Sequence, residues 1–126
     1  MIRYRYADLT DPAGPFLYVT VANPISGQQL ENIAGQIDTA ADRTVVPRAI
    51  VELLGLAQNG SASFLGFAGS ITELPLYIME VLIHDLSPIR IRAVVGEQEP
   101  WILLGRDALN MLRILLDGPN LKFEIS

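Results

Sequence analysis

The stretch 36–47 carries the side chains best suited to chemistry in this chain. Asp38 follows the apolar Ile37, and a second acid, Asp42, comes a few residues later. An acid at the end of a buried strand meets a ligand in a partly desolvated place, where its pKa can be tuned. One carboxylate alone does little hydrolytic chemistry, whereas two that share a proton can activate water. The chain has one such loop, so we expect a second copy to come from a second chain.

The residues on either side of Asp38 predict the elements that position it. Residues 30–37 read as a strand that ends in a polar loop. The β-branched run 44–46 predicts a second strand, and Pro47 suits the first turn of a helix. Residues 48–54 have the apolar spacing of a short helix, and Gly55 is placed to end it.

The same order of elements is predicted again further along the chain. Residues 89–95 alternate in polarity as a half-exposed strand, and 101–104 read as a buried strand. Gly105 would let the backbone pass close to another segment, and 106–112 predict a second short helix. Strand, loop, strand and helix therefore occur twice, around 33–56 and around 89–112.

Two motifs in these units resemble those of retroviral-type aspartic proteases, the retropepsins. Residues 38–42 are similar to the family's active-site pattern Asp-Thr-Gly-Ala-Asp, with Ala40 in place of glycine. Residues 103–106, Leu-Leu-Gly-Arg, resemble its two apolar residues followed by Gly-Arg and a short helix. The resemblance, to a bacterial-type single-domain relative, implies a mostly β, single-lobe acid protease fold with two short helices and a flap hairpin. It implies one domain over residues 1–126.

The resemblance also implies roles for the residues of the loop. Asp38 from each of two chains would form the dyad of a homodimeric aspartic endopeptidase, which hydrolyses bonds in a peptide or protein substrate. Thr39 would bond across the dimer axis, and Asp42 and Arg106 would form a supporting ion pair. The loop-support set that the resemblance implies is Thr39, Ala40, Ala41, Asp42 and Arg106.

Residues 61–83 read as a long β-hairpin whose tip is Gly66, Phe67, Ala68 and Gly69. Glycines on both sides of a tip let the loop bend and approach the backbone of a ligand. The resemblance implies that this hairpin is the flap that closes over bound peptide. An ordinary hairpin turn is the alternative.

Composition excludes several other classes of function. The net charge is −5 and there is no run of Lys or Arg, so we expect neither nucleic acid nor an anionic membrane as a partner. Without cysteine, and with His84 alone beside Asp85 in a predicted turn, we expect no metal, no cofactor and no thiol nucleophile. No signal peptide or stretch of ~20 apolar residues is present, which makes a cytoplasmic protein the expectation.

Two other interpretations stay open on the sequence. Ala40 could mark a catalytically inactive retropepsin fold that binds peptide or only dimerises. Alternatively, the chain could be a small β-rich adaptor in which Asp38 merely caps a turn. The pair of motifs counts against the adaptor.

Overall fold

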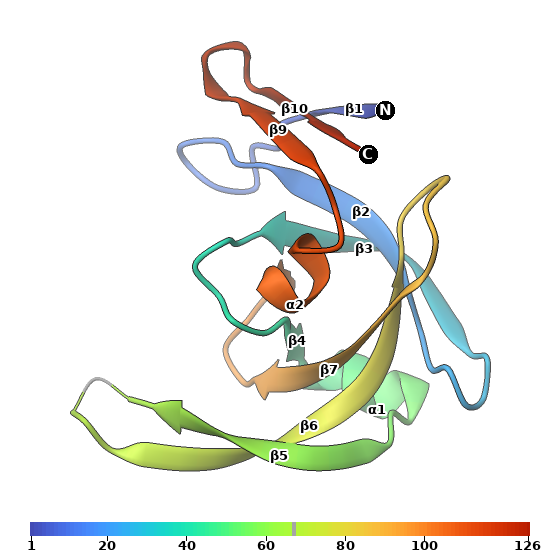
Figure 1. Cartoon of the computed structure of the whole chain (residues 1–126), viewed down its shortest axis with the longest axis vertical. Coiled ribbons are helices and arrows are strands. Elements are labelled where there is room, and N and C mark those ends of the chain that lie inside the picture. The colour runs from blue at the N-terminus through green and yellow to red at the C-terminus, as the bar shows by residue number, and fades with distance from the viewer. Residues whose placement is uncertain (67) are drawn as a thin grey trace.

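The computed structural model describes residues 1–66 and 68–126, and most of its regular structure is β-strand (Figure 1). Ten strands, two α-helices and one 3-10 helix follow one another along this part of the chain. Their order is β1 (Ile2–Arg5), β2 (Phe16–Ala22), β3 (Gln29–Ile37), β4 (Val45–Pro47), α1 (Arg48–Leu54), β5 (Gln58–Leu65), β6 (Ile71–Leu82), β7 (Ile89–Gly96), β8 (Ile102–Leu104), α2 (Arg106–Leu109), β9 (Ile114–Asp117), η1 (Gly118–Asn120) and β10 (Lys122–Ile125).

The larger sheet has seven strands in the order β2-β3-β8-β4-β7-β6-β5. Strand β2 also pairs with β6, so the sheet curves back on itself around the core. Alternation of apolar and polar residues explains which side chains face inward. In β7, Ile89, Ile91 and Ala93 are buried, whereas Arg90 and Arg92 point out to solvent.

The repeated order of elements gives the centre of this sheet a two-part arrangement. Strand β3 runs parallel to β8, and β4 runs parallel to β7. Strands β4 and β8 meet in the middle as an antiparallel pair, with Val45 opposite Leu103. Each half therefore pairs one of its strands with a strand of the other half. The loops that follow β3 and β7 consequently lie close to the centre of the sheet.

A smaller sheet is built from both ends of the described chain, in the order β1-β10-β9. Phe123 on its central strand is fully buried, and Tyr4 stacks on it with ring centroids 5.1 Å apart. Strand β10 is paired on both sides, so the unpaired edges of this sheet are β1 and β9. In Figure 1 the smaller sheet lies at the opposite end of the molecule from the β5–β6 hairpin.

The predicted fold class is confirmed, with small differences in the bounds of elements. The first helix spans the predicted residues 48–54 and ends at Gly55, whose φ of 58° is left-handed. The second is regular only over Arg106–Leu109, and turn hydrogen bonds from Met111 and Leu112 continue it to the predicted end. The hairpin strands cover 58–82, close to the predicted 61–83.

Membrane-spanning helices are absent from 1–66 and 68–126, where no helix combines the required length and apolarity.

Candidate active site

The loop 38–44 leaves the end of β3 and turns back towards β4, and its first residue is held by the backbone. The Asp38 N–H donates to the Leu104 carbonyl on the parallel strand β8, at 3.0 Å. The Asp38 carbonyl accepts from the Ala41 N–H at 3.2 Å, which closes a turn. The Asp38 carboxylate is half-buried and accepts from the Ala40 N–H at 3.1 Å. These hydrogen bonds therefore fix the position of Asp38 at the end of β3, next to β8.

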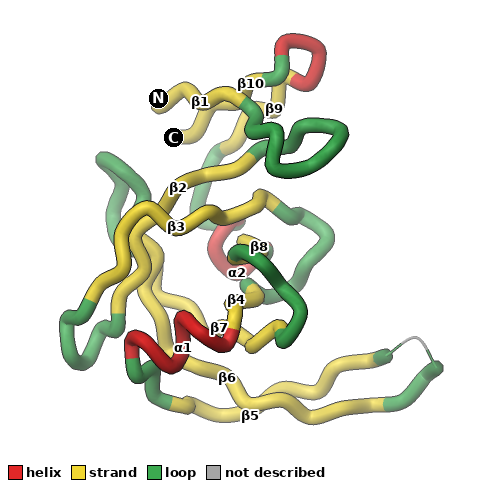
Figure 2. Tube along the Cα trace, turned by 180° about the vertical axis from the view of Figure 1, so that it is seen from behind, coloured by secondary structure: helices red, strands yellow, loops and turns green. Residues whose placement is uncertain are grey.

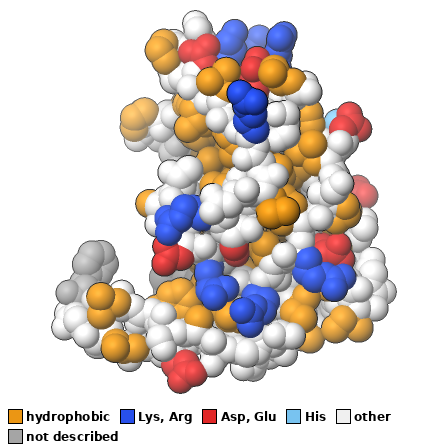
Figure 3. Space-filling model, in the orientation of Figure 1, with side chains coloured by type: hydrophobic (Ala, Val, Ile, Leu, Met, Phe, Trp, Pro, Cys, Tyr) orange, Lys and Arg blue, Asp and Glu red, His pale blue; other side chains and the backbone are white. Residues whose placement is uncertain are grey.

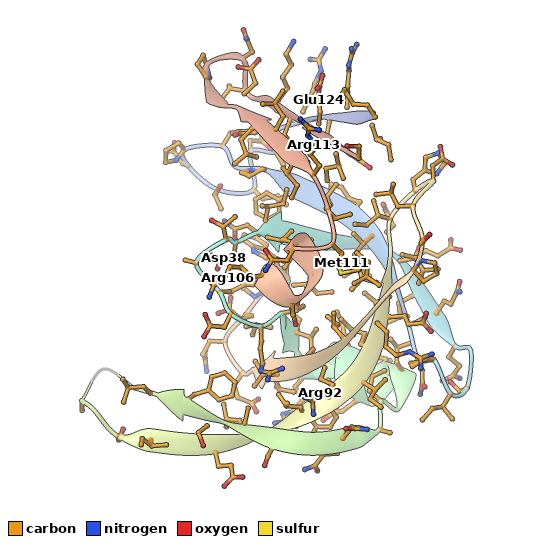
Figure 4. All side chains as sticks on the ribbon, in the orientation of Figure 1. Asp38, Arg92, Arg106, Met111, Arg113 and Glu124 are labelled. Carbon is orange, nitrogen blue, oxygen red and sulfur yellow. The ribbon has the colours of Figure 1, made fainter. Side chains whose placement is uncertain are left out.

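Arg106, the first residue of α2, holds the outer side of the loop. Its guanidinium forms an ion pair with Asp42 and donates to the Thr39 carbonyl at 2.8 Å. Its backbone N–H donates to the Ala41 carbonyl at 2.9 Å. Figure 4 shows Arg106 beside Asp38, on the same side of the molecule. One residue thus fixes three points of the loop.

Asp107 holds the far end of the loop, a contact that the sequence analysis missed. Its carboxylate accepts from the Thr44 N–H at 3.0 Å and from the Thr44 hydroxyl at 2.8 Å. The Thr44 hydroxyl in turn accepts from the Gly105 N–H at 3.2 Å, and Thr44 is fully buried. The signal in the sequence was an acid in the first turn of a short helix, which alone suggests only a helix-end charge.

Gly105 is needed because another backbone passes across it, as the sequence predicted. A Cβ at this position would lie 2.4 Å from the carbonyl carbon of Arg43 and 2.8 Å from the Thr44 nitrogen. The backbone of Gly105 is extended, with φ −89°, so conformation alone would allow any residue there. The close approach brings the loop against the start of α2.

Ala40 is exposed at the outer turn of the loop, where the sequence resemblance has glycine. Among the described residues the non-glycine positions with positive φ are Asn32, Asp85 and Leu121, so Ala40 adopts its backbone without strain. Its side chain lines a hollow together with Asp42, Arg43, Val45 and Phe64. The methyl group therefore affects the space for a ligand rather than the shape of the loop.

The β5–β6 hairpin extends along the same side of the molecule as this loop (Figures 1 and 2). Two adjoining hollows, of about 300 and 680 Å³, lie between them. Figure 3 shows the end of the hairpin standing away from the body of the molecule. At the tip, the Gly66 N–H donates to the Ser70 carbonyl at 2.8 Å, and the Gly69 N–H to the Gly66 carbonyl. The proposed flap residue Phe67 lies outside the described residues; Ala68 and Gly69 are exposed.

Structural comparison now assigns this arrangement of strands, loop and hairpin to a known fold. A retropepsin-like aspartic protease from Rickettsia conorii superposes with a TM-score of 0.63, at 15% identity over 97% of this chain and 88% of its own. The fold is that of the retropepsin-like proteases. EIAV protease, solved with the inhibitor HBY-793, is similar with a TM-score of 0.54 and 21% identity over 78% of this chain and 86% of its own.

The retroviral protease-like domain of Ddi1 from Leishmania major also shares the retropepsin-like fold. Its TM-score is 0.50, at 12% identity over 88% of this chain and 94% of its own. No protein-family model matches the sequence, and no curated protein matches it significantly. The likeness therefore lies in the arrangement of the backbone, as expected when packing is kept while most side chains change.

Within this retropepsin-like fold, Asp38 differs from the other acids around the loop. Asp42 is paired with Arg106, and Asp107 is bonded to Thr44. No group of three or more potential metal ligands occurs in the described part of the chain. His84 is exposed in a turn next to Asp85, with Nε2 3.3 Å from its carboxylate. Among the residues that the structure describes, Asp38 is the acid at this loop whose carboxylate has no side-chain partner.

Proposed function

We propose that the chain is an aspartic endopeptidase that works as a homodimer, with Asp38 as its catalytic residue. The observation that carries the proposal is the contrast between Asp38 and the other acids at the loop. Asp42 and Asp107 have structural partners, whereas the Asp38 carboxylate accepts one backbone hydrogen bond and is open to a ligand. The retropepsin-like fold supports the proposal independently.

In this mechanism Asp38 of one protomer and Asp38 of its partner share one proton. Like charges about 3 Å apart cannot both ionise, so one acid stays protonated. The ionised carboxylate takes a proton from a water held between the two, and the water oxygen bonds to the carbonyl carbon of the substrate. The protonated acid donates its proton to the carbonyl oxygen, which gives a tetrahedral intermediate. Collapse of the tetrahedral intermediate breaks the C–N bond, and the amine leaves with a proton from the dyad.

The loop supports would hold Asp38 in place for this chemistry. Arg106 binds the Thr39 carbonyl and the Asp42 carboxylate, which leaves the exposed Thr39 hydroxyl available to a second loop across the dimer axis. Ala40 and Ala41 complete the turn with their backbone N–H groups. A reactive group placed on such a fixed loop keeps the geometry that the reaction requires.

The β5–β6 hairpin is proposed as the flap over bound peptide. It borders the hollows beside the loop, and its tip residues Gly66 and Gly69 are exposed. An extended peptide between loop and hairpin could bond to the main chain on either side. We propose peptide or protein as the substrate and the whole chain as one domain.

The dimer contact is proposed at the smaller sheet, whose free edges are β1 and β9. A sheet edge with unpaired N–H and C=O groups is a template for pairing with another chain. Strand β9 also exposes Leu115 (61%) and Leu116 (48%), which a second copy would cover. Because β10 is already paired on both sides, the partner would add at an edge and not at the chain's last strand.

A catalytically inactive peptide-binding or dimerising domain is the second candidate, and Ala40 is the feature that favours it. The exposed methyl group lines the hollow where a peptide would run. The unstrained backbone of Ala40 weighs against it, because the loop keeps its shape.

The test is cleavage of mixed peptides between pH 4 and pH 7, with and without pepstatin. Wild-type protein should cut peptides in a pepstatin-sensitive way. Asp38→Asn keeps the shape of the side chain but removes the shared proton and the base, so the rate should fall by at least about a thousandfold. Cleavage that persists in purified Asp38→Asn protein would refute the assignment.

Sedimentation of the same proteins tests the dimer. Wild-type and Asp38→Asn should both sediment as dimers at tens of micromolar, and Leu115→Glu should shift the protein towards monomer. A wild-type protein that stays monomeric even with pepstatin present would leave the dyad without its second acid.

A further inference from the structure

Arg43 is the charged side chain of this cleft that the proposed chemistry does not use. It follows Asp42 in the loop, is half-buried, and lines both hollows between the loop and the β5–β6 hairpin. Its guanidinium forms no ion pair or hydrogen bond within 1–66 and 68–126, whereas Arg48, Arg90 and Arg106 each contact a carboxylate. A partly desolvated charge without a partner is costly, and a ligand of opposite charge would relieve that cost.

Among the described residues that line the two hollows, no acid is free to pair with Arg43. Asp42, the acid that lines the same hollows, is occupied by Arg106. On the hairpin, Glu73 accepts from the Ser61 hydroxyl at 2.5 Å and lies opposite Ser63 in the ladder. The other lining residues are uncharged: Ala40, Ala41, Val45, Ala62, Ser63, Phe64, Leu65 and Val94.

We infer that Arg43 selects substrates that carry a glutamate side chain close to the scissile bond. The inference rests on the proposed function of the cleft and names its substrate class. The aliphatic stem of glutamate would lie along the apolar wall formed by Val45, Phe64 and Val94. Its carboxylate would then accept two parallel hydrogen bonds from the guanidinium of Arg43. The chain as a whole is acidic, at −5, so a preference for acid has to come from this local contact.

Arg92, which lies next to Gly60 of the same hairpin, provides a contrast. Figure 3 shows several Lys or Arg side chains above the hairpin, and Figure 4 labels Arg92 among the side chains there. The Nη1 of Arg92 lies over β5, 3.2 Å from where a Cβ on Gly60 would be. Arg92 lines neither of the two hollows, so it would add to the general field without touching the substrate side chain.

The experiment compares kcat/KM for peptides that differ only by Glu, Gln or Lys at each position within four residues of the cut. At one position the Glu peptide should be cleaved about fivefold better than the Gln peptide of the same shape. Arg43→Gln should bring this ratio close to one, and Arg43→Glu should turn the preference towards Lys. Arg90→Gln, which removes an arginine already in contact with Glu80, is the matched control and should keep the ratio.

Binding of the same peptides to Asp38→Asn protein, followed by fluorescence anisotropy, gives a readout that needs no cleavage. The Glu peptide should bind more tightly than the Gln peptide, and Arg43→Gln in the same background should remove the difference. The inference is overturned if Glu and Gln peptides behave alike, or if Arg92→Gln lowers the ratio as much as Arg43→Gln. If wild-type protein cuts nothing but still prefers the Glu peptide in binding, the proposed protease activity fails while the role of Arg43 stands.

Discussion

In both halves of the central sheet an arginine at the start of a helix pairs with an acid, but the two loops are held to different extents. Each half is a strand, a loop, a strand and a helix, and each helix starts with an arginine that reaches an acid in the loop of the other half. Arg106 at the start of α2 pairs with Asp42 of the first loop, and Arg48 at the start of α1 pairs with Glu97 of the second. The crossed pairing follows from the parallel contacts of β3 with β8 and of β4 with β7.

The halves differ in how many further bonds each helix makes to the loop. In the first loop, the Thr39 carbonyl also accepts from the Arg106 side chain, and Thr44 donates to the Asp107 carboxylate of α2. From α1 to the second loop, the contact found in the described structure is the pair of Arg48 with Glu97. The second loop also has a turn from Glu99 to Gly96, and its Trp101 donates from Nε1 to Gln36 of β3 at 3.0 Å. The helix α2 therefore makes more bonds to the loop that carries Asp38 than α1 makes to the second loop. This difference indicates that the first loop is held in a fixed geometry, whereas the second only connects its two strands.

The largest effect is expected from the backbone contact that joins the first loop to α2. Gly105→Ala places a methyl group 2.4 Å from the carbonyl carbon of Arg43, so one backbone must move. We expect a loss of about 3 kcal/mol in the free energy of unfolding, measured with urea, and little remaining cleavage. Gly118→Ala is the matched control, because a Cβ there meets nothing within 4 Å. Equal stability of the two variants would show that the loop is not fixed by this contact.

Removing each crossed arginine in turn tests the difference between the halves directly. Arg106→Gln loses the pair with Asp42 and the hydrogen bond to the Thr39 carbonyl, and kcat/KM should fall ten- to a hundredfold, about the cost of misplacing a catalytic group. Arg48→Gln loses an ion pair whose arginine is about as exposed as Arg106, and it should leave peptide cleavage within about twofold. If both variants lose activity equally, the second loop is as important to the site as the first.

Ala40→Gly probes the surface of the first loop without touching its supports. The backbone of Ala40 is unstrained, so the loop should keep its shape, and removal of the methyl group opens the hollow. We expect peptide cleavage to stay the same or to rise a few-fold. Unfolding should be easier by about 0.5 kcal/mol, because glycine has more freedom in the unfolded chain. A wild-type protein that is silent and gains activity only as Ala40→Gly would favour the inactive-domain interpretation.

The smallest effect is expected from titration in the second loop. Hydrogen bonds from Arg48 lower the pKa of Glu97 below its usual value. The pair therefore stabilises the fold above the ordinary glutamate pKa of about 4.3, and this contribution is lost as the pH falls through the lowered value. Wild-type protein should show a slightly higher Tm than Glu97→Gln at pH 7, and the two should converge below pH 4. If the difference in Tm between wild-type protein and Glu97→Gln persists in strong acid, the effect comes from packing rather than from charge.

The sequence by itself determined the positions of most elements and suggested the chemistry that is proposed for the loop. Alternation in β7, the apolar spacing of α1 and the left-handed stop at Gly55 are local patterns, and their local physics sufficed to predict them. The motif at 38–42 pointed to a paired carboxylate because the residue types themselves limit the chemistry.

Only the tertiary structure decided which residues support the loop and which are left without a partner. Thr44 and Asp107 are 63 residues apart in the chain, and their contact depends on β4 and β8 meeting at the centre of the sheet. The guanidinium of Arg43 likewise lacks an ion pair with the neighbouring Asp42 because Arg106, distant in the chain, pairs with that acid. Local patterns specify strands and helices, but the choice among distant partners is made by burial and hydrogen bonding when the whole sheet assembles.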